Sequence, residues 1–248
     1  MQATTKTRHA RRLLRDQRGV SAPPATIQHY EKVEAECRVL LGSTRFASVE
    51  ALIAALTTEL GTRKIKEYEF TDLYFRPESE EGAKLIARGK TVRARRWTKY
   101  AMENGIRKEQ SVQIVSATSE TVMHEGVPFK VGVKTVLGNH ATIEDATRAL
   151  AGKGLAPWFS IAKSNGVHYH VLADPEVDCR FACEGVTVSA ESRRWSSTMV
   201  EIEVISDDKA KAVAIYKKVL GALGVSESDV IGEPMFVFAL NKLGISQG

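Results

Sequence analysis

The sequence has no hydrophobic run that could cross a membrane, since none of its apolar stretches approaches the roughly 18 residues that a spanning helix needs. It has only three cysteines in 248 residues, too few for a disulfide framework. The N-terminus also lacks the apolar stretch of a secretory signal peptide. We therefore expect a cytoplasmic protein of a reducing compartment, with organelle targeting by residues 1–20 left open.

Acidic residues are nearly absent from the first 30 positions, which hold six Lys or Arg residues and the single acid Asp16. This excess accounts for the net charge of the whole chain, +5, so the remaining residues are neutral as a group. The segment has no apolar periodicity and ends near Pro23 and Pro24. We predict a basic flexible arm over residues 1–29, which would contact RNA through its arginines, serve as a transit peptide or be a solvated tail.

Residues 30–248 predict one domain of the α+β class, because no linker interrupts them. Alternating apolar and polar residues predict strands, and apolar residues at helical spacing predict helices. The predicted strands are 30–41, 66–76, 91–97, 110–116, 128–136, 158–163, 166–172, 176–182, 185–191 and 198–205. The predicted helices begin at Ser48, Thr142, Ser206 and Pro234. Many strands with few helices between them favour an antiparallel sheet that closes, or nearly closes, on itself with helices outside.

Charged residues occupy the polar face of several predicted strands in pairs. The pairs are Glu34 with Glu36, next to Arg38; Arg93 with Arg95; Lys130 with Lys134; and Glu201 with Glu203. In an open sheet each pair would lie on a solvated face. In a closed barrel the same pairs would face one lumen, where carboxylates suit Mg²⁺ or Mn²⁺ and basic side chains suit phosphate oxygens. The pattern therefore indicates a site for a metal-bound polyphosphate.

The order of these motifs resembles that of the CYTH superfamily, the triphosphate tunnel metalloenzymes, over residues 30–243. Glu34–Arg38 resembles the first-strand signature E-x-E-x-K, and Asp72–Tyr74 and Val92–Arg95 resemble the D-x-Y and L-R-x-R strands. Further along, Phe129–Lys134 is similar to L-T-x-K, and Ile161–Lys163 is similar to the start of the K-x-R stretch. Val200–Glu203 matches the late E-x-E strand, and Pro234–Leu243 resembles the S-Y-x-x-L-L ending. The resemblance implies a closed eight-stranded antiparallel β-barrel, a tunnel, with flanking helices.

Three positions depart from the superfamily pattern. Arg38 stands where the superfamily has Lys, and Asn165 stands where the second basic residue of K-x-R is expected. The acidic residue some ten positions before the late E-x-E is Glu191, where Asp is usual.

The resemblance also assigns roles to residues. It implies a metal site for Mg²⁺ or Mn²⁺, and phosphate contacts from the basic side chains. The implied metal ligands are Glu34, Glu36, Glu191, Glu201 and Glu203. The implied phosphate-binding residues are Arg38, Arg93, Arg95, Lys134 and Lys163. Catalysis is expected to rest on Glu34, Glu36, Arg38 and Glu203.

The activity expected from this resemblance is metal-dependent hydrolysis of a small anionic triphosphate, either inorganic triphosphate, thiamine triphosphate or a nucleoside triphosphate. Three alternatives use the same tunnel. They are nucleotide cyclisation as in class IV adenylate cyclases, an RNA 5′-triphosphatase aided by the basic arm, and a non-catalytic polyphosphate-binding module.

Overall fold

The computed structural model describes residues 27–28, 33–86, 90–102 and 112–246. The predicted arm over 1–29 lies outside the described residues except for Ile27–Gln28, and the early part of the strand predicted over 110–116 also lies outside them. Within the described part, no helix is long and apolar enough to span a membrane.

Eleven strands and five α-helices make up the described residues, which confirms the α+β class. The strands are β1 (Ile27–Gln28), β2 (Val33–Leu40), β3 (Thr62–Pro77), β4 (Lys90–Met102), β5 (Val112–Thr118), β6 (Glu120–His124), β7 (Val127–Val131), β8 (Lys134–His140), β9 (Leu155–Val171), β10 (Asp178–Ala190) and β11 (Arg193–Ser206). The helices are α1 (Val49–Leu60), α2 (Glu80–Ile86), α3 (Ile143–Ala151), α4 (Lys209–Leu223) and α5 (Met235–Leu243).

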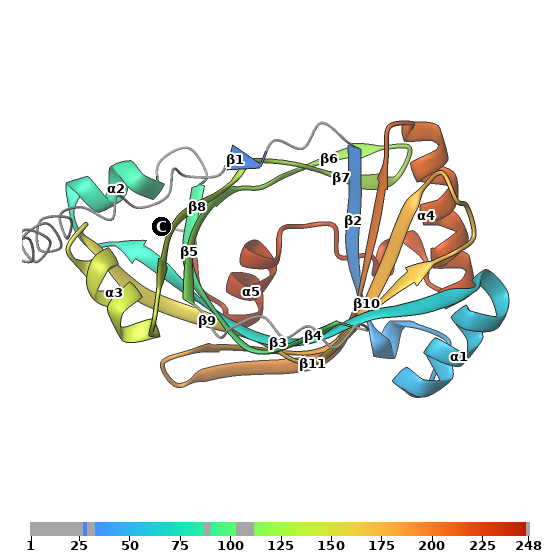
Figure 1. The fold of residues 1–248 in the computed structure, drawn as a ribbon, viewed down its shortest axis with the longest axis horizontal. Coiled ribbons are helices and arrows are strands. Elements are labelled where there is room, and N and C mark those ends of the chain that lie inside the picture. Colours follow the sequence, from blue (N-terminus) through green and yellow to red (C-terminus); the bar gives the residue numbers. More distant parts are fainter. Residues whose placement is uncertain (1–26, 29–32, 87–89, 103–111, 247–248) are drawn as a thin grey trace, which may run out of the picture.

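All strand pairs are antiparallel and belong to one sheet of order β1-β8-β5-β4-β3-β9-β10-β11-β2-β7-β6. The sheet curls into a ring-like outline (Figure 1). The prediction of a closed eight-stranded barrel is nevertheless wrong, because no ladder between described strands joins the two ends of this order, β1 and β6. The chain itself crosses between the two parts of this order twice, through Ser119 between β5 and β6 and through Gly132 and Val133 between β7 and β8.

Gly132 is required by a close approach at this crossing, since a Cβ atom there would lie 2.0 Å from the carbonyl oxygen of Thr118. The Thr118 amide donates to the Val133 carbonyl at 3.0 Å, and the Val133 amide donates to Thr118 Oγ1 at 3.0 Å. The strand predicted over 128–136 is therefore two strands, which lie near opposite ends of the sheet order.

Two further strand predictions merge in the structure. The pair 158–163 and 166–172 forms the single strand β9, and 176–182 with 185–191 forms β10. Both strands continue through irregularities in the ladder, of which one lies between Cys183 and Gly185. A bulge lets a strand bend and continue where its alternation is broken, so the interruption in the pattern is not an end of the strand.

The helix ends follow local capping chemistry. Ser48 Oγ accepts the Ala51 amide at the start of α1, and Thr142 Oγ1 accepts the Asp145 amide at the start of α3, as predicted. The cap of α4 is Asp208 and not the predicted Ser206, because the Asp208 carboxylate accepts from the Ala210 and Lys211 amides. Ser206 Oγ instead accepts from the Asp208 amide, one step before the helix.

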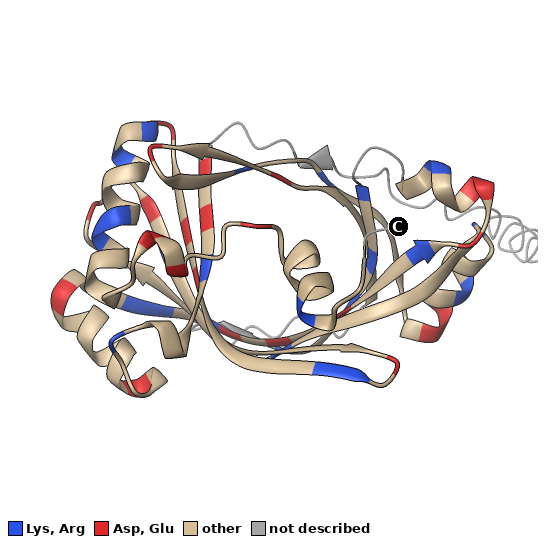
Figure 2. Cartoon of the chain, turned by 180° about the vertical axis from the view of Figure 1, so that it is seen from behind, with Lys and Arg blue, Asp and Glu red and all other residues tan. Residues whose placement is uncertain are grey.

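The helices bury apolar faces of the curved sheet and leave a polar face inside the ring. Helices α1 and α4 pack over β2, β10 and β11, while α3 packs over β4 and β5 on the other side (Figure 1). Helix α5 lies within the outline of the ring and packs on β10 and β11. Both acidic and basic positions are distributed over the sheet as well as over the helices (Figure 2). The charge pairs predicted on β2, β4 and β11 lie on the inward face of the sheet.

Candidate functional site

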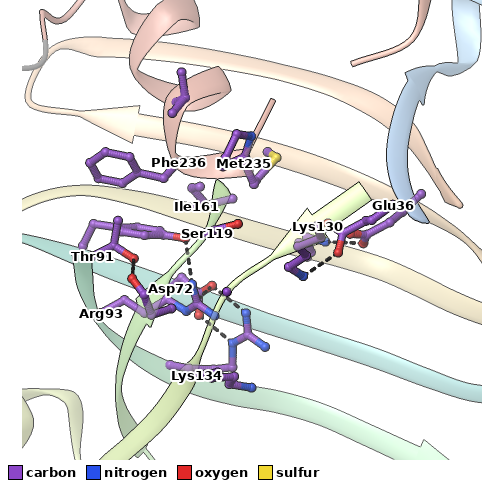
Figure 3. A pocket seen from close by; sticks show the side chains of 18 of the residues that line it. Glu36, Asp72, Thr91, Arg93, Ser119, Lys130, Lys134, Ile161, Met235 and Phe236 are labelled. Carbon is purple, nitrogen blue, oxygen red and sulfur yellow. Dashed lines mark hydrogen bonds and ion pairs between the residues drawn. The ribbon is translucent and has the colours of Figure 1, made fainter. Parts of the chain in front are cut away.

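A cavity of about 990 Å³ occupies the inside of the curved sheet. Nine of the ten residues implied by the motifs line it, and they come from five strands far apart in the sequence. These nine are Glu34, Glu36, Arg38, Arg93, Arg95, Lys134, Lys163, Glu201 and Glu203. Figure 3 shows Glu36 and Lys130 on one side of the cavity and Asp72, Arg93 and Lys134 on the other. The curled sheet thus brings the charged faces together although it does not close.

Strand register explains why the two E-x-E motifs meet. In the antiparallel pair of β11 with β2, Glu201 lies opposite Arg38 and Glu203 lies opposite Glu36. Because side chains of directly opposed residues project to the same face, all four charges point into the cavity. The early and late motifs are therefore one cluster in space.

Arg38 joins the two motifs electrostatically. Its guanidinium donates to Glu36 and, at 2.6 Å, to Glu201 Oε1. The side chain is 8% exposed, and burial acts to lower its pKa, but the two carboxylates raise it above the usual value. Arg38 is thus held charged between two carboxylates.

Lys130 neutralises the other end of the carboxylate cluster. Its ammonium lies 3.2 Å from Glu34 Oε1 and also contacts Glu36. Burial, together with the neighbouring carboxylates of Glu36 and Glu203, nevertheless raises the pKa of Glu34 to about 8. Burial and Glu201 likewise raise the pKa of Glu203. The nearby cations therefore do not offset burial at Glu34 and Glu203, whereas Lys163 and Arg38 outweigh burial at Glu201 and hold its pKa well below the usual value.

Lys163 connects the cluster to a buried carboxylate that the motifs did not indicate. Lys163 Nζ lies 2.9 Å from Glu201 Oε2 and 2.6 Å from Glu184 Oε1. The Tyr68 hydroxyl donates to the other oxygen of Glu184. Burial raises the pKa of Glu184, while Glu184 and Glu201 raise the pKa of Lys163 against its own burial. A row of alternating charges therefore runs from Glu184 to Glu34.

A second ionic group lies on β3 and β4. Asp72 accepts two hydrogen bonds of 2.7 Å from Arg95, and its second oxygen lies 3.3 Å from Arg93 Nε. The pKa of Asp72 is lowered, because the effect of burial is outweighed by the two guanidinium groups. Asp72 belongs to the D-x-Y motif, and its place here is to orient the two arginines that face the cavity.

Lys134 has no carboxylate partner among the described residues. Burial, followed by the proximity of Arg95 and Arg93, lowers its pKa to about 8. Three basic side chains thus gather beside one Asp, which leaves an excess of positive charge on this wall. Such a wall suits an anion with several oxygens.

Glu191 lies apart from the cluster. It occupies the turn between β10 and β11, exposed and with a φ of 49°, and does not line the cavity. The hairpin is long enough to carry its turn well beyond the position opposite Glu201, which is Ala182. The acid of β10 that contacts the cluster is Glu184, seven positions earlier in the chain, through Lys163.

The donor set is that of a hard cation, since the clustered groups are all carboxylates, and burial together with neighbouring carboxylates raises the pKa values of Glu34 and Glu203. Among the described residues, no three His, Cys, Asp or Glu side chains are arranged to hold one ion by themselves. Mg²⁺ commonly takes only one or two protein carboxylates and completes its shell with water and phosphate oxygens. The residues therefore fit a cation shared with a bound phosphate.

Comparison with known proteins gives matches in structure alone. No protein-family model and no curated protein matches this chain. The chain is similar to the PH1819 protein of Pyrococcus horikoshii OT3, with 13% sequence identity over 84% of this chain and 99% of that chain, and a TM-score of 0.51. At this identity the likeness shows a shared fold.

Two further structures are more distant. A protein from Vibrio parahaemolyticus assigned as an adenylate cyclase has 12% identity over 85% of this chain and 98% of that one, with a TM-score of 0.45. The RNA triphosphatase domain of the mimivirus mRNA capping enzyme has 8% identity over 79% of this chain and 92% of that one, with a TM-score of 0.43. The structures similar to this chain thus include one assigned as an adenylate cyclase and one RNA triphosphatase domain.

Proposed function

We propose that this protein hydrolyses a triphosphate with the help of Mg²⁺ or Mn²⁺. The observation that carries the proposal is the contact, inside one cavity, between a wall of basic side chains and a crowded carboxylate cluster. Buried like charges are unfavourable unless a counter-charge is supplied. A metal-bound triphosphate supplies both counter-charges at once, the anion for the basic wall and the cation for the carboxylates.

The basic residues would bind and align the phosphates. Arg93 and Arg95 already have their guanidinium groups fixed by Asp72, so little side-chain freedom is lost when they bind phosphate oxygens. Lys134 lies beside them without a carboxylate partner, and Lys163 bridges from this wall to Glu201. The triphosphate would lie with successive phosphates on Arg93, Arg95 and Lys163.

The carboxylates would act at the terminal phosphate. When held by one or two of the carboxylates Glu34, Glu36, Glu201 and Glu203, the metal would neutralise charge on the phosphate oxygens. Glu203 would orient a water molecule toward the terminal phosphorus and accept its proton, since its raised pKa makes it a better base than a free carboxylate. The bond from the terminal phosphorus to the bridging oxygen breaks, and Arg38 and Lys163 offset the charge left on the departing diphosphate.

The test is product analysis combined with a matched pair of arginine variants. Wild-type protein is incubated with inorganic triphosphate, ATP, thiamine triphosphate or triphosphate-ended RNA, with Mg²⁺, Mn²⁺ or EDTA. We expect metal-dependent release of free phosphate, whereas cyclic nucleotide with pyrophosphate would identify a cyclase. Binding without any metal-dependent turnover would identify a non-catalytic module.

Arg95 and Arg96 are neighbours on β4, but Arg95 lines the cavity and Arg96 does not. We expect Arg95→Gln to lower kcat/KM by about 10- to 100-fold, because a hydrogen bond to a charged group contributes about 1.5–3 kcal/mol. Arg96→Gln is expected to leave kcat/KM unchanged. Equal effects in the two variants would contradict the proposed binding wall.

A further inference from the structure

One end of the cavity is aromatic and apolar. Tyr74, Trp158 and Phe236 contribute to its lining, with ring centroids 5.4 Å apart for Tyr74 and Phe236 and 5.7 Å apart for Trp158 and Phe236. Trp158 and Phe236 are half-buried, so part of each ring faces the cavity. Phe236 and Met235 come from α5, and Figure 3 shows Phe236 well away from Glu36 and Lys130.

This aromatic end adjoins the basic wall directly. Arg93 Nη1 lies 3.3 Å from the Tyr74 hydroxyl, and the guanidinium carbon lies 5.8 Å from the centroid of the Tyr74 ring. Tyr74 is also opposite Arg93 in the ladder between β3 and β4. A ligand whose phosphates lie on Arg93 and Arg95 would therefore extend its next chemical group over Phe236 and Trp158.

The size and charge of this end limit what that group is. A cavity of about 990 Å³ is at the upper end of the range of roughly 300–1,000 Å³ that holds organic ligands. The described carboxylates that line it are Glu34, Glu36, Asp72, Glu201 and Glu203. Asp72 is occupied by Arg93 and Arg95, and the other four belong to the cluster beyond Lys163. No described acid at the aromatic end offsets a positive charge on a ligand ring.

From this geometry we infer that the substrate is a nucleoside triphosphate, whose uncharged base stacks on Trp158 and Phe236 while its terminal phosphate points toward Glu203. The inference rests on the proposed function for the direction of the phosphates, and adds the substrate class. Thr91 and Ser119 also line the cavity near this end and offer hydroxyl groups to the polar edge of a base (Figure 3). Inorganic triphosphate leaves the aromatic end unused, and the cationic ring of thiamine triphosphate places a charge beside Arg93.

Binding measurements with a matched pair of tryptophan variants test this inference. Trp158 lines the cavity, whereas Trp195 packs against Phe238 in the same apolar cluster and does not line it. Dissociation constants are measured without added divalent metal for wild type, Trp158→Leu and Trp195→Leu. The ligands are the β,γ-imido analogue of ATP, inorganic triphosphate and thiamine triphosphate.

We expect wild type to bind the ATP analogue more tightly than the other two ligands. Trp158→Leu should weaken binding of the analogue by about 5- to 50-fold, in line with the loss of one base–aromatic stack, and change binding of inorganic triphosphate by less than about twofold. Trp195→Leu should leave all three constants unchanged, with thermal unfolding reporting whether each variant is folded.

Three outcomes would overturn the inference: equal affinity of wild type for the analogue and for inorganic triphosphate, an equal loss for both ligands in Trp158→Leu, or tighter binding of thiamine triphosphate than of the analogue. Failure of the proposed hydrolysis is distinguishable from these. Base-dependent binding without phosphate release contradicts the hydrolysis and leaves the base site standing. Phosphate release that is insensitive to Trp158→Leu overturns the base site alone.

Discussion

Lys163 Nζ lies 2.6 Å from Glu184 Oε1, and the Glu184 side chain has no exposed surface. The ammonium is thus held from behind by a carboxylate that does not line the cavity, while its other contact, Glu201, does. Gly166 makes room for the Tyr68 ring that supports Glu184, since a Cβ atom at Gly166 would lie 2.5 Å from that ring. A buried layer of polar side chains therefore sets the direction of the cavity-lining lysine.

Glu184→Gln is expected to lower the free energy of unfolding by about 3 kcal/mol, because removing one partner of a buried ion pair leaves the other charge uncompensated. Urea unfolding measures the change. Glu191→Gln is the matched control, because it removes the same charge from an exposed turn of the same hairpin. Equal stability of the two variants would mean that Glu184 does not hold Lys163.

Glu203→Gln is expected to weaken Mn²⁺ binding by at least about tenfold, since it removes a carboxylate from the crowded cluster. Glu191→Gln should leave Mn²⁺ affinity unchanged, because its side chain lies away from the cavity. Calorimetric titration of both variants in the presence of a non-hydrolysable triphosphate gives the comparison. A loss in Glu191→Gln would restore Glu191 to the ligand set that the resemblance implies, and unchanged affinity in Glu203→Gln would refute the assignment of Glu203.

Anion affinity is expected to fall as the pH rises through about 8, because burial and the neighbouring arginines lower the pKa of Lys134 to about 8. The same shift predicts a stability effect. The pKa in the folded state is below the ordinary value of 10.5, so the unfolded chain binds more protons between these values and the contribution of Lys134 to stability rises from about pH 8 to 10.5. Dissociation constants for inorganic triphosphate and urea midpoints between pH 7 and 10 measure both effects.

Lys134→Met should remove this component of both pH profiles, relative to wild type titrated with the same ligand. Lys134→Arg keeps its charge throughout the range and should preserve anion affinity at pH 9. Parallel profiles for wild type and Lys134→Met would show that another group is responsible.

Deletion of residues 2–26 is expected to leave phosphate release from a small triphosphate unchanged, because every described residue that lines the cavity comes from Glu34 or later. The deletion removes the whole net positive charge of the chain. It should therefore weaken binding to triphosphate-ended RNA and reduce its salt dependence, by a logarithmic slope of about 0.7 for each lost contact with a single strand. Unchanged RNA affinity would end the proposed role of this segment in RNA binding, and loss of small-substrate turnover would make it part of the site.

The inward faces of β2, β4 and β11 could be predicted from the sequence because charged and apolar residues alternate strictly over 33–38, 92–95 and 200–204. Strict alternation fixes which residues share a face, whatever the strand pairs with. The seven site residues on these strands therefore reach the cavity as implied. Alternation does not show how far along a hairpin the partner of a residue lies. Glu191 was assigned to the metal site from its spacing to Glu201 alone, whereas the ladder places Ala182 opposite Glu201.

Glu184 escaped prediction for a local reason. It lies between the segments 176–182 and 185–191, at the irregularity in the ladder of β10 with β9, where the alternation of polar and apolar residues fails. Lys130 had a visible signal, since it shares a face with Lys134, but the break between β7 and β8 sends these two lysines to different groups of partners. The sequence also could not predict whether the sheet closes, because pairing between the terminal strands of a curved sheet depends on their separation in space.

The link from Val131 to Lys134 has a mechanical consequence. It joins the tenth and second strands of the order through only two intervening residues, and a span of three peptide units reaches no more than about 11 Å. Ser119 alone joins β5 to β6, the third and eleventh strands of the order, so two short covalent links limit the width of the ring. A single proteolytic cut between Gly132 and Val133 would therefore not open the ring, because Ser119 would still connect its two sides. Widening the cavity with every ladder intact would require both links to be cut.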